Sequence, residues 1–140
     1  MPIPHAHHHA AGIFGAFPFG AFPLATPHPE HRSMITGNTR LLAHIGYPTR
    51  TFRSPMIYNP WFAHVGEDVV VVPFASQPDS YPALLRALFD TGNVVGALIT
   101  MPHKSTTPAL LDRVSVAARI AGACNAVRRA PDGSLEGDMF

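Results

Sequence analysis

The sequence has a single cysteine and little charge of either sign. Cys124 cannot form an internal disulfide and has no second cysteine with which to bind zinc, so a reducing, cytoplasmic compartment fits best. Only 14% of the 140 residues are charged, and the formal net charge is +1. No run of Lys or Arg provides a basic patch, so neither nucleic acid nor a membrane surface is an expected partner.

The residue types that are abundant gather at the N-terminus. Residues 1–33 hold six of the nine His, six of the fifteen Pro and four of the nine Phe. Their apolar stretch, 12–25, contains two prolines and follows His instead of Lys or Arg, which argues against a signal peptide. Because the histidines lack a fixed scaffold, a flexible tail is favoured over a metal site. We therefore expect a His/Pro/Phe-rich flexible tail at 1–33 and one domain at 34–140, with Met34 as an alternative translation start.

From Met34 onward, short apolar runs alternate with helical patterns. We expect strands at 39–46, 68–75 and 93–100, helices at 54–66, 79–92, 107–115 and 116–122, and a hairpin at 125–140. The later strands are apolar at successive positions, which is typical of strands covered on both faces. Strands separated by helices favour parallel pairing with right-handed crossovers. The predicted fold class is α/β, an open, mostly parallel sheet with helices on both faces and a C-terminal β-hairpin.

The predicted helix at 54–66 has recognisable ends. Ser54 is the expected N-cap, Pro55 suits the first helical position, and Gly66 is the expected terminator. Pro60 falls too far inside to be free of the helical hydrogen-bond ladder, so it is expected to kink the helix.

Lys104 stands close behind the apolar strand predicted at 93–100. In an open α/β sheet, ligands bind in the crevice outside the carboxyl ends of the strands. The loops after two strands hold Ser54 on one side and Thr100, His103 and Lys104 on the other, so both loops can line one cleft. A partly desolvated lysine there would serve as a general acid or base. A solvated loop lysine explains the same pattern, and the pattern alone leaves both open.

Three segments occur in an order and spacing typical of one family. They are "IGYPTRTFRSPMIYN", "GALITMPHK" and "AARIAGACNAVRRAPDGSLEGD". These segments resemble motifs of the substrate-binding domain of the shikimate/quinate dehydrogenase family, and the resemblance extends over residues 36–140. It implies an enzyme that moves a hydride between NADP, or NAD, and a ring hydroxyl of shikimate or quinate.

The resemblance also implies residue roles. Lys104 matches the catalytic lysine beside the reacting hydroxyl, and Thr100 and Asn125 match residues that bind ring hydroxyls. Ser54 matches the second of two serines that hold the substrate carboxylate. These side chains suit those tasks, because a hydroxyl donates to a carboxylate and an amide both donates and accepts. For Asn125, a structural hydrogen bond before the hairpin is compatible with ligand binding.

The sequence departs from the family pattern at several positions. Phe52 replaces the first serine, Leu98 replaces an asparagine, and Ala126 replaces a threonine. Met139 and Phe140 stand where Asn-Thr is usual. Two polar contacts thus become apolar, so we expect a divergent member whose ligand is less hydroxylated than shikimate or differently shaped.

A different residue could hold the carboxylate in place of the lost serine. Arg50 or Arg53 would do so through a bidentate contact. The alternative for both is an ordinary solvated arginine in a loop.

The sequence contains no G-x-G-x-x-G motif between a strand and a helix, so this chain alone is expected to bind no NADP. The resemblance implies a fragment whose cofactor domain would follow Phe140. The predicted function is the substrate-binding and catalytic-lysine half of a shikimate dehydrogenase-like, NADP-dependent oxidoreductase acting on a small cyclic hydroxy acid. Without the cofactor domain, the chain is expected to be inactive.

The alternatives are a non-catalytic binding or sensor module for a shikimate-like or quinate-like acid, and a folded relic without a ligand. The sequence does not fix the oligomeric state.

Overall fold

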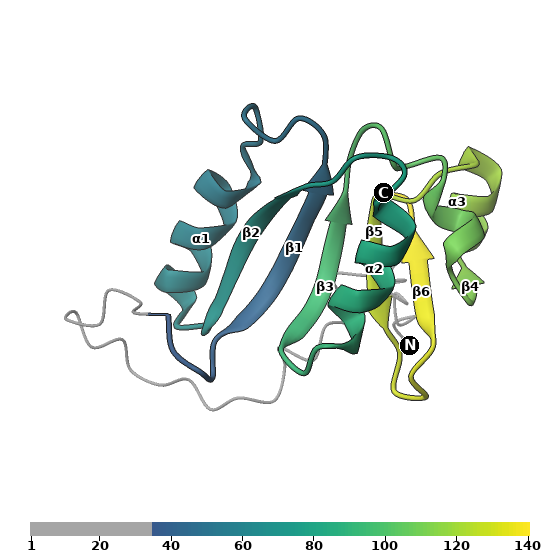
Figure 1. The fold of residues 1–140 in the computed structure, drawn as a ribbon. Coiled ribbons are helices and arrows are strands. Elements are labelled where there is room, and N and C mark those ends of the chain that lie inside the picture. Colours follow the sequence, from purple (N-terminus) through teal and green to yellow (C-terminus); the bar gives the residue numbers. More distant parts are fainter. Residues whose placement is uncertain (1–34) are drawn as a thin grey trace, which may run out of the picture.

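The computed structural model describes residues 35–140, and the tail predicted at 1–33 lies outside them. The strands are β1 (Arg40–Gly46), β2 (Val69–Ala75), β3 (Val94–Ile99), β4 (Arg113–Val114), β5 (Ala126–Arg129) and β6 (Leu135–Asp138). Within the described part they form one six-stranded sheet in the order β2-β1-β3-β5-β6-β4 (Figure 1). Strand β1 pairs in parallel with β2 and β3, whereas β5 runs antiparallel to β3 and β6. The predicted α/β class and C-terminal hairpin are confirmed.

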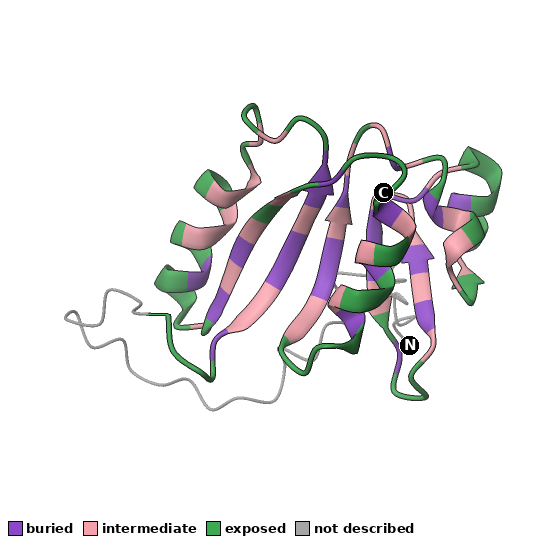
Figure 2. Ribbon diagram, in the orientation of Figure 1, coloured by how far each residue is buried: buried purple, intermediate pink, exposed green. Residues whose placement is uncertain are grey.

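The helices cover the two faces of this sheet. They are α1 (Ser54–Val65), α2 (Tyr81–Asp90), the 3₁₀ helix η3 (Thr107–Leu110) and α3 (Val116–Ala121). Alternate residues of β1 point to opposite faces. Ala43 and Ile45 belong to a buried cluster with Leu85 of α2, and Leu42 belongs to a second cluster with Phe62 of α1. Figure 2 shows this burial concentrated along the central strands. Each fully buried large apolar side chain contributes about 1.5–3 kcal/mol to folding.

Helix α1 begins and ends almost as its sequence predicts. The N-cap is Arg53, without a side-chain capping bond, so the assignment of Ser54 as N-cap is wrong by one residue. Gly66 ends the helix in a left-handed conformation with φ of 76°, which favours glycine. The helix runs from Ser54 to Val65 with Pro60 inside it. Within the described residues, no helix combines the length and the apolar character needed to cross a membrane.

The segment 107–115 does not form the predicted α-helix. Only the short helix η3 forms, and the chain then becomes extended to pair β4 with β6. The backbone N–H of Asp112 donates to the carbonyl of Leu135 at 3.0 Å. Pairing with a distant strand therefore overrides the local helical pattern.

Strand β2 lies at the edge of the sheet, and the covering on both faces predicted for 68–75 is only partial. Val69 and Val71 are buried, whereas Pro73 is exposed. Proline has no N–H and is tolerated where a strand has no neighbour. Asn59 of α1 occupies the open edge: its Oδ1 accepts the N–H of Val71 at 2.7 Å, and its Nδ2 donates to the Val71 carbonyl at 3.3 Å. Helix α1 thus closes part of the free edge.

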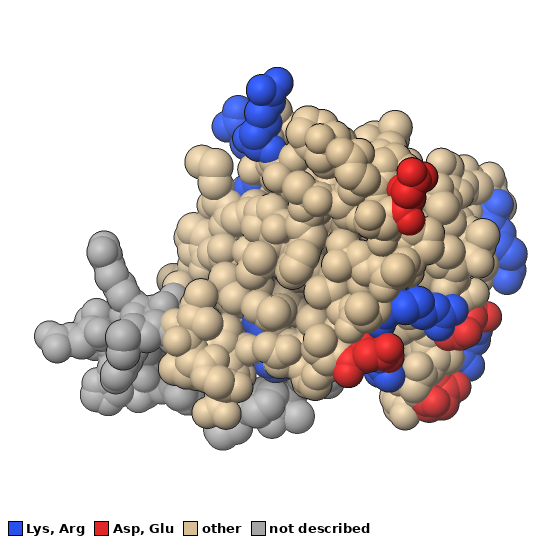
Figure 3. All heavy atoms as spheres, in the orientation of Figure 1, with Lys and Arg blue, Asp and Glu red and all other residues tan. Residues whose placement is uncertain are grey.

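The hairpin of β5 and β6 carries a network of ion pairs. Arg113 of β4 contacts Asp132 at 2.8 Å and Glu136 at 2.9 Å, and Arg128 contacts Glu136 at 2.7 Å. On the face shown in Figure 3, side chains of both signs lie next to one another near this hairpin. The network joins the short strand β4 to the hairpin, so its charges serve the fold.

Candidate functional site

The carboxyl ends of β1 and β3 lie side by side at one edge of the sheet (Figure 1). In the parallel register, Ile45 lies opposite Ile99. The N–H of Thr100 donates to the carbonyl of Ile45 at 2.9 Å, and the N–H of Tyr47 donates to the carbonyl of Met101 at 3.0 Å. These bonds hold the two following loops against each other, as expected for a ligand crevice in this fold class.

Gly46, the last residue of β1, is the point of closest approach between the two loops. A Cβ atom added there would lie 2.7 Å from Cζ of Phe52 and 2.9 Å from the carbonyl oxygen of Met101, and it would also collide with the methyl group of Thr100. The missing side chain therefore lets Phe52 and Thr100 meet over the end of the strand. Two of the residues singled out from the sequence are thus brought together.

His44 lies beside the predicted site residues Ser54 and Phe52, although it was not itself predicted from the sequence. Its Nδ1 is hydrogen-bonded to Oγ of Ser54, and its ring stacks on Phe52 with centroids 4.0 Å apart and planes at 23°. In the sheet it lies opposite Leu98 of β3. Burial lowers the pKa of the imidazole below its usual 6.5, which favours the neutral form.

A signal for His44 was present in the sequence. It is the one polar side chain in the apolar run 41–46, at the end of a strand. In an otherwise apolar strand, such a residue needs a polar partner. Ser54, ten positions later, is that partner, and only the fold shows it.

Lys104 follows β3 in a loop that lies against the segment before β5. Its backbone carbonyl accepts the N–H of Cys124 at 2.9 Å, and the carbonyl of Asn125 accepts the N–H of Ile99 at 2.8 Å. Lys104 is partly buried and is the only lysine in the sequence. Within residues 35–140, its ammonium group has no salt bridge and no hydrogen bond. The backbone therefore positions Lys104 and Asn125 near the same end of β3.

Asn125 already uses part of its hydrogen-bonding capacity. Its Nδ2 donates to the Phe140 carbonyl at 2.6 Å, and its Oδ1 accepts the N–H of Phe140 at 3.3 Å. An amide offers two N–H donors and two lone pairs, so one of each remains for a ligand. The structural hydrogen bond expected before the hairpin is therefore present and leaves room for a second role.

His103 does not line the cleft, which corrects the expectation from its place beside Lys104. It is 2% exposed, its Nε2 lies 2.9 Å from the Ser76 carbonyl oxygen, and its ring stacks on Tyr81 at 4.0 Å. Thr107 donates to the His103 carbonyl at 2.8 Å and shares a 2.7 Å hydrogen bond with the Tyr81 hydroxyl. Burial raises the pKa of Tyr81 to about 12, so this hydroxyl keeps its proton. His103 therefore anchors the loop that carries Lys104.

Two further candidates lie at the surface of the loop after β1. Arg50 and Arg53 are both exposed, whereas Phe52 between them is partly buried. Within residues 35–140, neither guanidinium has a hydrogen-bond or ion-pair partner. A carboxylate contact and an ordinary solvated loop position therefore both stay open for these arginines. In the same part of the chain, no three His, Cys, Asp or Glu side chains gather to hold a metal ion.

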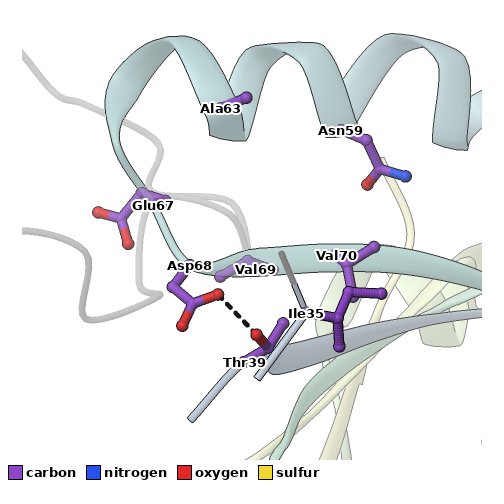
Figure 4. A pocket seen from close by; sticks show the side chains of 8 residues that line it. All are labelled: Ile35, Thr39, Asn59, Ala63, Glu67, Asp68, Val69 and Val70. Carbon is purple, nitrogen blue, oxygen red and sulfur yellow. Dashed lines mark hydrogen bonds between the residues drawn. The ribbon is translucent and has the colours of Figure 1, made fainter. Parts of the chain in front are cut away.

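A pocket of about 160 Å³ lies elsewhere, between α1 and the amino ends of β1 and β2 (Figure 4). It is lined by Ile35, Thr39, Asn59, Ala63, Glu67, Asp68, Val69 and Val70. Its polar side chains already have partners inside the domain. Thr39 donates to Asp68 at 2.8 Å, Arg40 pairs with Glu67 at 2.8 Å, and Asn59 bonds to the backbone of β2. The pocket thus has no polar side chain awaiting a ligand, and we assign it none.

Comparison with known proteins gives a consistent result. Residues 44–127 match the family model of the shikimate dehydrogenase substrate binding domain. Shikimate dehydrogenase (NADP(+)) of Nostoc sp. is 43% identical over 96 residues, which cover 69% of this chain and 33% of that protein. The enzyme of the same name from Rubrobacter xylanophilus is 43% identical over 103 residues, 74% of this chain and 36% of that protein. The chain spans about a third of the length of these relatives.

A solved structure agrees with these relatives. Shikimate 5-dehydrogenase from Listeria monocytogenes, in complex with shikimate and NAD, is similar with a TM-score of 0.71 and 33% sequence identity. The similarity covers 76% of this chain and 36% of that chain.

Proposed function

Because the chain belongs to the family of shikimate dehydrogenase substrate-binding domains, we propose that it forms the substrate-binding and catalytic-lysine half of an NADP-dependent shikimate dehydrogenase-like oxidoreductase. The meeting of the loops after β1 and β3 carries this proposal. Ser54, which is hydrogen-bonded to His44, and Thr100 come to one end of the sheet in this way. Lys104 lies in the loop that follows β3 at the same end. A small cyclic hydroxy acid is the ligand class that these groups fit.

Each proposed residue has a distinct task in this cleft. The Ser54 hydroxyl donates to the ligand carboxylate, and Thr100 and Asn125 bind ring hydroxyls. Lys104 takes the proton of the reacting hydroxyl during oxidation and returns it during reduction.

Two apolar residues shape the proposed specificity. Phe52 stacks on the His44 ring, and Leu98 lies opposite His44 in β3. These two apolar residues take the place of polar ones and narrow the proposed ligand cleft, so the preferred ligand carries fewer hydroxyls than shikimate or has a different shape.

The cofactor is assigned to another part of the enzyme. NADP supplies the hydride acceptor in such a reaction. No glycine-rich turn between a strand and a helix occurs in this sequence to receive its pyrophosphate. The residues present therefore do not fit NADP, and the 140-residue chain alone is expected to bind acids without oxidising them.

The sole lysine permits a direct test. Reductive methylation with ¹³C-formaldehyde labels Lys104 and the N-terminal amine, so a carbon NMR signal reports on this one side chain. We expect shikimate or quinate to shift the Lys104 signal in a saturable way. Ser54→Ala should weaken binding about tenfold, since a hydrogen bond to a charged group is worth about 1.5–3 kcal/mol.

The control is Ser80→Ala, at an exposed serine without a capping bond, which should leave the affinity unchanged. If the Lys104 signal stays fixed while the acids bind, the lysine is remote from the ligand and a non-catalytic sensor module becomes the better account. If no acid binds, the proposed ligand class is wrong.

A further inference from the structure

The His44–Ser54 pair lies where the proposed function puts carboxylate recognition. Phe52 occupies the position of the first serine, so Ser54 is the only serine hydroxyl of the two that remains. Its Oγ is hydrogen-bonded to Nδ1 of His44, and the Phe52 ring lies against the imidazole at 4.0 Å. The imidazole is therefore one hydrogen bond away from the atom assigned to the carboxylate. It is also partly exposed.

The protonation state of this pair decides how many donors it offers. With a neutral imidazole the pair has two polar hydrogens, and one of them lies between Nδ1 of His44 and Oγ of Ser54. One donor then remains for a ligand. With a protonated imidazole, Nδ1–H donates to Oγ, so the hydroxyl hydrogen and Nε2–H are both free. The protonated pair thus offers two donors and a positive charge, which suits a carboxylate better than a neutral pair does.

We propose that His44 replaces the missing serine, and that the chain takes up a proton on His44 when a carboxylate ligand binds. The inference rests on the proposed function, because it concerns the same cleft. Where the family pattern has two serine hydroxyls as donors, this chain would use the Ser54 hydroxyl and the His44 imidazolium. Recognition of the acid group is thereby made dependent on pH.

His44 is the titrating group of this cluster, because the side chains packed against it do not titrate near neutral pH. Strand β2 places Pro73 beside it and strand β3 places Leu98. The loop contributes Phe52, and helix α1 contributes Ser54. None of these four side chains changes charge between about pH 5 and 8.

The charged side chains of the two loops after β1 and β3 are all basic. They are Arg50 and Arg53 in the first loop and Lys104 in the second. Burial lowers the pKa of His44 and so favours the neutral imidazole in the empty cleft. A bound carboxylate has the opposite effect and favours the imidazolium.

The test compares an acid with its uncharged ester on the full 140-residue chain. Calorimetric affinities for shikimate and methyl shikimate are measured at about pH 5.5 and about pH 8, on either side of the usual histidine pKa. We expect shikimate to bind several-fold more tightly at the lower pH, and a pKa rise of about one unit on binding would limit this gain to about tenfold. The ester should show no such change.

Two variants separate titration from packing. His44→Gln keeps hydrogen-bonding groups but cannot titrate, so it should bind shikimate with one affinity at both pH values. His64→Gln makes the same substitution at an exposed histidine of α1 and should retain the wild-type pH dependence. Adding Phe52→Ser to His44→Gln should raise the affinity for shikimate at both pH values.

A spectroscopic measurement on the wild type makes the test independent of how the variants fold. Imidazole resonances of His44, identified through their contacts with the Phe52 ring, should titrate at higher pH when shikimate is present. An unchanged His44 titration, or a pH dependence that persists in His44→Gln, overturns the inference and leaves the proposed function standing. Failure of both acid and ester to bind overturns the two together.

Discussion

At the scale of single residues, Gly46 is a position where an added side chain has no room. We expect Gly46→Ala to destabilise the domain by about 1–3 kcal/mol, because the new Cβ meets the Met101 backbone and the Phe52 ring, and a backbone neighbour cannot give way cheaply. Shikimate binding should weaken as well, since the two loops are forced apart. Urea unfolding provides the measurement.

Gly92→Ala is the matched control for this substitution. No atom lies within 4 Å of a Cβ added at Gly92, so its effect should be small. Equal effects of the two substitutions would show that the loops adapt to a side chain at Gly46.

Phe52 and Leu98 permit a second prediction at this scale, on specificity. The double variant Phe52→Ser, Leu98→Asn should bind shikimate at least about tenfold more tightly, which corresponds to about 1.4 kcal/mol. The added hydroxyl and amide restore two polar contacts. Because Leu98 packs against the buried cluster beneath α1, stability must be measured alongside affinity.

The arginine alternative predicts a different pattern. An unchanged affinity in the double variant, together with a strong loss in Arg50→Ala or Arg53→Ala, would mean that arginine has taken over the carboxylate contact and that the ligand is of the ordinary shikimate type.

At the scale of elements, the contact of helix α1 with the edge of β2 is the feature most open to test. Asn59→Ala leaves the N–H and carbonyl of Val71 without their partner, and we expect a loss of about 1–3 kcal/mol of stability. The opened edge should also promote association through strand pairing. Thermal unfolding and light scattering at several protein concentrations measure both effects.

Asn38→Ala, at an exposed asparagine before β1, is the control and should change neither property. If Asn59→Ala stays as stable and as monodisperse as this control, the amide contributes nothing to the edge.

The elements also show what the sequence could and could not predict. The apolar runs placed β1, β2 and β3, and the left-handed Gly66 ended α1 as expected, because these signals are local. The helix expected at 107–115 failed because β4 pairs with β6, more than twenty positions away. His103 was misplaced for a similar reason, since its partners Ser76 and Tyr81 come from another loop and helix.

The candidate site likewise contains residues that the sequence predicted and one that it did not. Motif resemblance named Ser54, Thr100, Lys104 and Asn125, and their roles stay predictions. His44 was missed because the family pattern gives no role to that position, and its hydrogen bond to Ser54 exists only after β1 and α1 have packed together.

At the scale of the whole molecule, the division at residue 33 remains a prediction. Deleting residues 1–33 should shift the melting temperature by less than about 4 °C, since about 1 kcal/mol corresponds to about 4–8 °C in a domain of this size. The reason is compositional, because prolines interrupt the apolar stretch of this segment and prevent a contiguous apolar face. A drop of many degrees in calorimetry would show that the segment packs on the domain.

The side chains of β1 and β3 point alternately to the two faces of the sheet, and this has a consequence for how such a domain can evolve. Ala43, Ile45, Ala97 and Ile99 belong to the core beneath α2, whereas His44, Leu98 and Thr100 lie on the side of Phe52. Point substitutions in the second set can therefore change the ligand specificity without altering the core beneath α2. A deletion of one residue within β1 would exchange the two sets, placing an imidazole in the core. Lineages of this domain should accordingly diversify by substitution in these strands and confine insertions and deletions to the loops.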